Sequence, residues 1–149
     1  MIVDSIENGI VIDHITAGFG LTVIDRLAID KRRHTIACIM NASSKKYGGK
    51  DLVKIVDVTD VDLAILGLID PNATVNVIEN GIIKEKINLK LPEKVINVIK
   101  CKNPRCVTSV EAGAPHIFHL ADAENREYRC EYCDDLVTVK GDHGYETLR

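Results

Sequence analysis

The sequence predicts an α+β fold over the first two thirds of the chain, followed by a small all-β module. Strand-like and helix-like apolar patterns alternate through the first ninety of its 149 residues. An Asn80-Gly81 pair between two strand-like runs indicates a tight hairpin, because both turn positions need positive φ. Four of the five cysteines come after residue 100, in two closely spaced pairs.

The chain opens with a strand and a helix. Residues 10–15 have the composition of a buried strand. After two glycines, apolar residues recur at three-to-four spacing and form one helical face; they are Leu21, Ile24, Leu27 and Ala28.

A second strand, a loop, a third strand and a second helix follow. Residues 34–40 predict the strand, 41–50 the loop and 51–58 the next strand. Thr59 and Asp62 then provide the start of a helix through Leu68, in the manner of a capping box. Proline cannot continue a helix, so Pro71 ends it.

The hairpin strands, 74–79 and 82–87, complete the order βαββαββ. This order favours a ferredoxin-like sandwich of the βαββαβ type, in which two helices pack on one face of a mostly antiparallel sheet. The segment around Pro92 is typical of a linker. We therefore expect two domains, 1–95 and 96–149, the second being a small all-β domain that resembles a zinc ribbon.

Composition and charge exclude several classes of protein. Charged residues make up 28% and hydrophobic residues 46%, a globular balance. The longest apolar run, 63–69, is far below the roughly 18 residues of a membrane span, and no secretory signal pattern opens the sequence. We expect no membrane partner and a cytoplasmic location.

Charge also disfavours a nucleic-acid partner. Residues 1–100 hold 13 Lys/Arg and 13 Asp/Glu, and residues 101–149 hold 6 Lys/Arg and 9 Asp/Glu. Neither part therefore offers a basic face for nucleic acid.

The paired cysteines predict a metal site. Cys101 and Cys106 are separated by four residues, and Cys130 and Cys133 by two. Two such knuckles suit one tetrahedral zinc ion, and four thiolates would leave no open position for catalysis. We expect a structural zinc that supplies much of the folding energy of this small module.

Two alternatives remain for this module, and one cysteine stands apart. Disulfides could join the same cysteines, although a reducing compartment disfavours them. His116 and His119 could replace a cysteine as ligands. Cys38 lies within a predicted strand and fits a buried apolar position.

The strands of the first domain carry unexpected polar residues. Phosphate-binding, nucleophile-elbow, HExxH and dinucleotide-binding patterns are absent from the sequence, so no catalytic residue is predicted. Lysines suit phosphate oxygens, Asn and His donate hydrogen bonds, and a carboxylate accepts from a sugar hydroxyl. Two interpretations are therefore open: these residues form a polyphosphate and ribose site, or they are solvated at strand edges. The residues are Asp13, His14, Lys54, Asn76 and Lys86.

Five stretches in order carry a family resemblance. They are VIDHI at 11–15, GGKDLVKI at 48–55, ATVNVI at 73–78, LPEKVINVIKC at 91–101 and the two cysteine pairs. Together they resemble the regulatory chain of aspartate carbamoyltransferase, over nearly the whole length. The resemblance implies a non-catalytic allosteric subunit of pyrimidine biosynthesis. It would bind nucleoside triphosphates (CTP, ATP and possibly UTP) in its first domain and attach to the catalytic chain through its zinc domain.

The resemblance also implies a role for individual residues. Asp13 would contact the ribose, Lys54 the ribose and base, and the main chain at two positions would read the base. The triphosphate would meet His14, Asn76 and Lys86. The complete implied nucleotide site is Val3, Asp4, Ile6, Val11, Asp13, His14, Lys54, Asn76, Gly81 and Lys86.

Partners follow from the same resemblance. Asn103 matches a family residue at the contact with the catalytic chain, and Arg105 stands where the family has an asparagine. A homodimer of regulatory chains would link catalytic trimers. The alternatives are a zinc-ribbon protein that binds nucleic acid, which predicts a basic face, and a stand-alone enzyme, which predicts turnover by the isolated chain.

One geometric condition follows for the first strand. Successive side chains of a regular strand point to opposite faces, so Asp13 and His14 would point apart. Both can reach one nucleotide only if the strand becomes irregular at Asp13.

Overall fold

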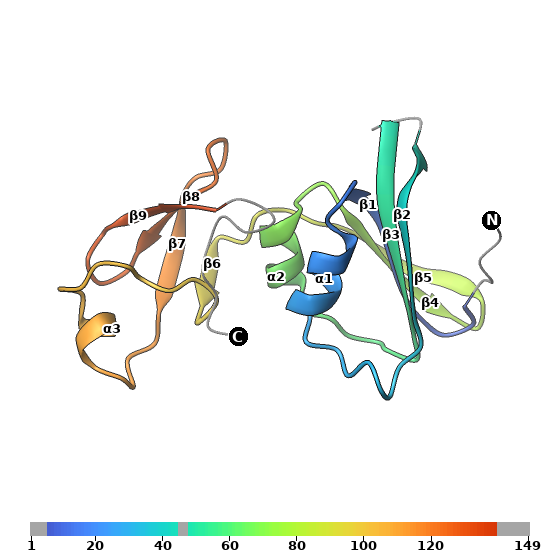
Figure 1. Cartoon of the computed structure of the whole chain (residues 1–149), viewed down its shortest axis with the longest axis horizontal. Coiled ribbons are helices and arrows are strands. Elements are labelled where there is room, and N and C mark those ends of the chain that lie inside the picture. The colour runs from blue at the N-terminus through green and yellow to red at the C-terminus, as the bar shows by residue number, and fades with distance from the viewer. Residues whose placement is uncertain (1–5, 45–47, 140–149) are drawn as a thin grey trace. The chain divides into compact units, whose positions relative to one another are not determined.

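The computed structural model describes residues 6–44 and 48–139. The chain divides into two compact units, Met1–Lys90 and Leu91–Arg149. Each unit has its own sheet: five strands in the first and four in the second (Figure 1).

The first unit confirms the predicted α+β sandwich. Its strands pair antiparallel in the order β2-β3-β1-β4-β5, and both helices cover one face of the sheet (Figure 1). The elements are β1 (Gly9–Thr16), α1 (Gly20–Arg26), β2 (Ile36–Ser44), β3 (Gly48–Val56), α2 (Leu63–Ile69), β4 (Thr74–Glu79) and β5 (Ile82–Asn88).

Alternation along the strands builds the core of this unit. Ile10 and Ile12 of β1, Val53 and Ile55 of β3 and Val75 of β4 are at most 1% exposed. They lie opposite one another across the three central strands. The intervening side chains, including Val11, Lys54 and Asn76, therefore point to the other face of the sheet, which is covered by no helix of the described residues.

The first strand is irregular where the sequence analysis requires it. Ile12 pairs with Val53 but Ile15 pairs with Asp51, so two residues of β1 stand against one of β3. His14 takes up the bulge at φ 58°. The extra residue returns Ile15 to the core, where it is 0% exposed. The expected departure from a regular strand at Asp13 and His14 is confirmed.

The predicted loop at 41–50 was wrong in most of its length. β2 runs on to Ser44 and β3 begins at Gly48, with Ala42 paired to Lys50. A second bulge permits this, because Asn41 adopts φ 57° and its N–H donates to Asp51 Oδ1 at 2.8 Å. The segment 41–50 has the composition of a loop, but the bulge at Asn41 lets both strands extend into it.

Two acids accept main-chain hydrogen bonds where the two helices begin. Asp51 is fully buried, and its Oδ2 accepts hydrogen bonds from Gly18 N at 2.9 Å and Gly20 N at 2.8 Å. Asp62 is the N-cap of α2, accepting from Ile65 N at 3.1 Å. The helix start predicted at Thr59 and Asp62 thus falls at Asp62.

The second unit is a small β-sheet with one short helical turn, which confirms the predicted all-β class. The sheet has the order β6-β7-β8-β9. Its elements are β6 (Lys94–Ile96), α3 (Val107–Val110), β7 (Ile117–Asp122), β8 (Glu127–Cys130) and β9 (Leu136–Thr138). Phe118 and Tyr128 are fully buried at its centre, and the Tyr128 hydroxyl donates to the Pro92 carbonyl.

Membrane-spanning helices are absent from 6–44 and 48–139. Both α1 and α2 have seven residues, against about 20 for a span.

Candidate functional site

A polar row crosses four neighbouring strands on the uncovered face of the first sheet. Lys54 of β3 lies opposite Val11 of β1, Val11 opposite Asn76 of β4, and Asn76 opposite Lys86 of β5. Directly opposed side chains point to the same face. Three strand spacings place the two lysine Cα atoms about 14 Å apart. Residues distant in sequence thus form one surface with a cation at each end.

A pocket of about 330 Å³ opens on this surface. Five of the residues in the predicted nucleotide site line it: Ile6, Val11, Lys54, Asn76 and Gly81. Three apolar residues that the sequence analysis missed complete the wall: Leu52, Ile78 and Ile83. Their strand positions were predictable, but a site on the uncovered face was not evident from apolar side chains alone.

Asn76 carries a polar atom that is ready for a ligand. Its side-chain Oδ1 is buried and has no hydrogen-bond partner within the described part of the chain. An amide oxygen that is buried away from water without a hydrogen-bond partner costs free energy, unless a bound molecule donates to it. Because Asn76 lines the pocket, a donor group of a bound molecule would meet that need.

Gly81 closes one end of the pocket through its main chain. Its N–H donates to the Glu7 carbonyl at 2.8 Å, and Asn80 N donates to Asn8 Oδ1 at 3.1 Å. A Cβ built on Gly81 would have no heavy atom of the described residues within 4 Å, apart from its chain neighbours.

Asp13 and His14 both face this side of the sheet. Asp13 lies opposite Thr74 of β4, and His14 Nδ1 is 3.2 Å from Thr74 Oγ1. Asp13 Oδ1 accepts from the His14 N–H at 2.7 Å. His14 also lines a second pocket of about 330 Å³, with Asn41 and Asn72 among its neighbours. The bulge therefore brings both residues to this face, but neither lines the pocket that contains Lys54 and Asn76.

Lys50 was missed by the sequence analysis, which assigned it to a loop. Its Nζ lies 2.8 Å from Asp13 Oδ1, and both side chains are 20% exposed. Burial raises the pKa of the Asp13 carboxyl, but the hydrogen bond and charge of Lys50, with the His14 N–H, outweigh it and hold the pKa below 3.8. The sequence did contain a signal for Lys50: Lys50, Leu52 and Lys54 are every second residue, so in one strand they would share a face.

The other predicted nucleotide contacts are placed as follows. Lys86 belongs to the polar row but does not line the pocket. Val3 and Asp4 lie outside the described residues.

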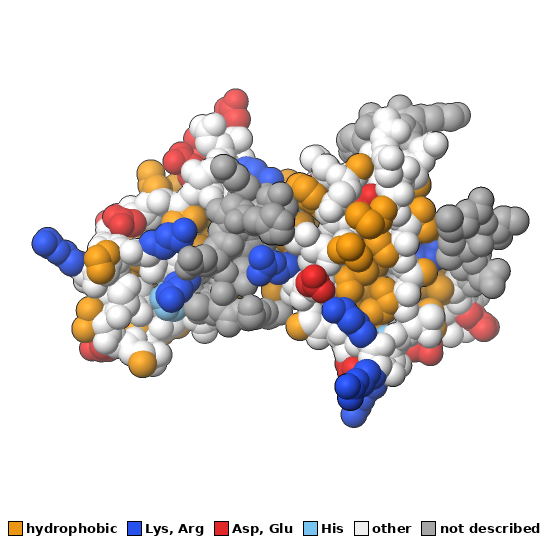
Figure 2. Space-filling view, viewed as in Figure 1, with side chains coloured by type: hydrophobic (Ala, Val, Ile, Leu, Met, Phe, Trp, Pro, Cys, Tyr) orange, Lys and Arg blue, Asp and Glu red, His pale blue; other side chains and the backbone are white. Residues whose placement is uncertain are grey.

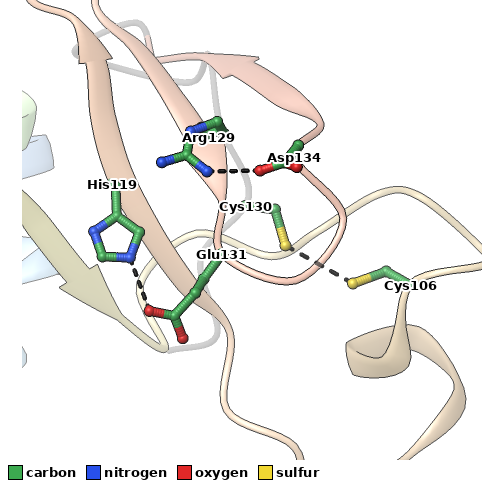
Figure 3. A network of polar contacts seen from close by, with 6 residues as sticks. All are labelled: Cys106, His119, Arg129, Cys130, Glu131 and Asp134. Carbon is green, nitrogen blue, oxygen red and sulfur yellow. Dashed lines mark hydrogen bonds and ion pairs between the residues drawn. The ribbon is translucent and has the colours of Figure 1, made fainter.

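In the second unit the four paired cysteines converge. Cys101 and Cys106 come from the loop before α3, Cys130 ends β8, and Cys133 lies in the following turn. Their four Sγ atoms lie within 4.8 Å of one another, with Cys101–Cys133 at 3.6 Å and Cys106–Cys130 at 3.8 Å. Figure 3 shows Cys130 and Cys106 pointing toward each other.

These distances fit a tetrahedral metal centre. A Zn–S bond of about 2.3 Å gives sulfur–sulfur separations of about 3.8 Å in a tetrahedron. A disulfide bond needs about 2.05 Å, and all five cysteines are free thiols. The donor set therefore suits a thiolate-binding dication.

The pKa values of the cysteine thiols shift in different directions. Burial raises the pKa of the Cys101 and Cys130 thiols. For Cys106 the burial effect is outweighed by hydrogen bonds from the Thr108 hydroxyl and N–H, so its pKa is lowered. The Thr108 hydroxyl lies 3.1 Å from Cys106 Sγ. A bound dication would hold all four as thiolates.

Neither alternative histidine ligand belongs to the sulfur cluster. His116 Nδ1 instead accepts a hydrogen bond from the Cys101 N–H at 3.1 Å. Burial and the charge of Lys100 lower the pKa of His116, in keeping with a neutral acceptor ring. His119 Nε2 lies 2.9 Å from Glu131 Oε1 (Figure 3).

The two knuckles differ in surface charge and in the role of Asn103. Asn103 Oδ1 accepts from Arg105 N at 3.0 Å, and Ser109 Oγ donates to the Asn103 carbonyl at 2.7 Å. Asn103 thus shapes the first knuckle, while Arg105 is exposed. In the second knuckle the acids Glu131 and Asp134 contact His119 and Arg129 (Figure 3).

Two family models match this chain. Residues 1–90 match the model described as the aspartate carbamoyltransferase regulatory chain, allosteric domain. Residues 93–141 match the model described as the metal binding domain of the same regulatory chain.

Curated relatives agree over most of the length. The chain is 56% identical over 134 residues to the aspartate carbamoyltransferase regulatory chain of Clostridium acetobutylicum, covering 90% of this chain and 92% of the relative. It is 52% identical over 136 residues to that of Clostridium botulinum (91% and 93%), and 51% over 135 to that of Bifidobacterium longum (91% and 97%). These matches confirm the resemblance and the expectation of a non-catalytic chain: the protein belongs to the family of aspartate carbamoyltransferase regulatory chains.

Proposed function

We propose that this chain senses nucleoside triphosphates, with CTP and ATP as effectors and UTP as a further candidate. It would transmit their binding to a catalytic chain that it holds through a zinc-loaded second unit. Pairs of these chains would link catalytic trimers. The observation that carries the nucleotide assignment is the row Lys54–Val11–Asn76–Lys86 over a pocket with an unsatisfied buried amide oxygen.

The pocket suits a base and ribose, and the cations suit phosphates. Its wall is largely apolar, which favours a flat heterocycle, and Asn76 Oδ1 can accept from a ligand donor. Asp13 can accept from a ribose hydroxyl, while His14, Lys50 and Lys86 surround the neighbouring surface with donors. Lysine ammonium groups bind phosphate as point charges.

Zinc is the metal we assign to the four cysteines. Four thiolates at tetrahedral spacing are the ligand set of structural zinc sites and leave no position open for a substrate. This centre would shape both knuckles, including Asn103 and Arg105, which we propose contact the catalytic chain.

The first unit also offers a surface for pairing two regulatory chains. β2 is an edge strand of the sheet. Met40 on β2 is 44% exposed and Leu21 on α1 57%. Figure 2 shows hydrophobic side chains gathered on this face of the unit. An exposed apolar patch beside an edge strand is a common protein contact surface.

Regulation requires a difference in affinity. A nucleotide changes activity only if it binds one state of the assembly more tightly than another, and the coupling is typically about 1–3 kcal/mol. Two nucleotides that compete for one pocket can act in opposite directions if each favours a different state.

Calorimetry with CTP and with ATP tests the nucleotide assignment. We expect Lys54→Ala and Lys86→Ala each to weaken triphosphate binding about tenfold or more, because each removes a charge-assisted contact of about 1.5–3 kcal/mol.

Lys84→Ala is the matched control. Lys84 lies on the same strand as Lys86 but is not opposite Asn76 in the polar row, and it pairs with Glu79 at 2.8 Å. Its replacement should leave affinity near that of the unmodified chain. Equal affinity in the Lys54 and Lys86 variants and this control would refute the site.

A further inference from the structure

We propose that Thr108 is a positioning residue of the four-cysteine centre, whose hydroxyl orients the Cys106 sulfur and increases retention of the metal. The inference rests on the zinc proposed above.

The contact is direct and shielded from water. Thr108 is 7% exposed and Cys106 2%. The hydroxyl oxygen lies 3.1 Å from Cys106 Sγ, and a sulfur acceptor accommodates longer hydrogen bonds than oxygen does. Thr108 follows Cys106 by two residues, at the start of α3, so its side chain is anchored on the same knuckle as the sulfur.

Charge makes this bond significant. Four thiolates around one dication leave a net charge of about −2 within a largely buried site. A hydroxyl that donates to one sulfur stabilises part of that charge, and hydrogen bonds to charged acceptors are roughly twice as strong as neutral ones. The bond also restricts rotation of the Cys106 side chain, so less freedom is lost when the metal binds.

The contact to Cys101 in the same knuckle is of another kind. There the main-chain N–H donates to His116 Nδ1, and the sulfur accepts from the main-chain N–H of Asn103. Thr108 therefore differs in donating a side-chain hydroxyl to a ligand atom. Outer contacts of this type typically change metal affinity by 10–100-fold when they are removed.

Thr108→Val tests this role in the full chain. Valine keeps the buried shape and removes the hydroxyl. Competition with a chromophoric chelator should show a zinc dissociation constant about 10–100-fold higher than in the unmodified protein. Thr108→Ser, which keeps the hydroxyl, should restore tight binding.

Cobalt provides a readout that a packing defect would not move. With Co²⁺ bound, Thr108→Val should keep the absorption pattern of a tetrahedral thiolate site. Its sulfur-to-metal charge-transfer band should move to lower energy, because an unbonded thiolate is more electron-rich.

Ser109→Ala is the matched control. Ser109 Oγ donates to the Asn103 carbonyl and not to a sulfur, so its loss should leave the charge-transfer band unchanged. If Thr108→Val binds zinc as tightly as the unmodified chain and leaves the band in place, Thr108 has no positioning role. If the unmodified chain itself takes up no zinc, the proposed metal centre fails instead.

Discussion

Two opposing effects set the pKa of the Asp13 carboxyl: burial raises it, and its contacts with Lys50 and His14 lower it. Its folded-state pKa lies below 3.8 because the Lys50 contact and the His14 N–H outweigh burial. For an acid with a lowered pKa, the stabilisation is fully present above the ordinary pKa. It is lost as the pH falls through the lower folded-state pKa.

We therefore predict that Lys50→Met raises the pKa of Asp13, because burial then acts with less opposition. Carboxyl-carbon NMR across an acid titration measures it directly. The same variant should lose less stability than the unmodified chain between neutral pH and pH about 3, since it lacks the pair that acid breaks. Lys54→Met is the control, because Lys54 is not among the causes of the Asp13 shift. An unchanged Asp13 pKa in Lys50→Met would contradict this account.

At the scale of elements, the pairing of β1 with β3 depends on one glycine. Gly9 has φ 147°, and a Cβ at this position would stand 2.2 Å from the Ile55 carbonyl oxygen on β3. The main chains approach closely here, at the edge of the pocket where Ile6 packs 3.0 Å from the same point. Glycine alone permits both the dihedral angle and the approach.

Gly9→Ala should lower the free energy of unfolding by about 3 kcal/mol or more, since backbone strain and a backbone clash add. Chemical denaturation of the first unit provides the measurement. Gly18→Ala separates the two causes: Gly18 also has positive φ, 99°, but a Cβ there meets no atom of the described residues within 4 Å. We expect it to cost only about 1 kcal/mol. Equal losses in both variants would exclude the close approach as a cause.

At the scale of the whole molecule, the two units should respond differently to metal removal. The second unit is a four-stranded sheet with a small core around Phe118 and Tyr128. Domains of about this size are marginal without a metal or disulfide, and a structural metal contributes folding energy directly. The first unit has its own five-stranded core and does not contain the cysteine cluster.

Chelation should therefore unfold the second unit while the first stays folded, and it should release the catalytic chain. Amide hydrogen exchange reports the two units separately, and co-purification reports attachment. Adding zinc back should restore both. Retained protection of β7 and β8 after chelation, or a catalytic chain that stays attached, would overturn the proposed role of the centre.

The sequence alone determined most elements of the first unit and the cysteine set. Period-two and period-3.6 apolar patterns are local, so the five strands of the first unit, except where β2 and β3 extend into 41–50, were predictable, together with both main helices and the hairpin at Asn80-Gly81. Cysteine spacing is also local, and it indicated which four thiols would meet. The polar residues of the strands were visible as exceptions to the apolar pattern.

Only the tertiary structure decided how those exceptions combine. Lys54, Asn76 and Lys86 become neighbours because strand order and register join distant segments, and local patterns contain neither. The bulge at His14 and the longer β2–β3 pair depend on contacts with Asp51 and Thr74, so Lys50 was read as part of a loop. The Thr108 bond to Cys106 likewise depends on the folded knuckle, because VTSV has no feature that marks a sulfur contact.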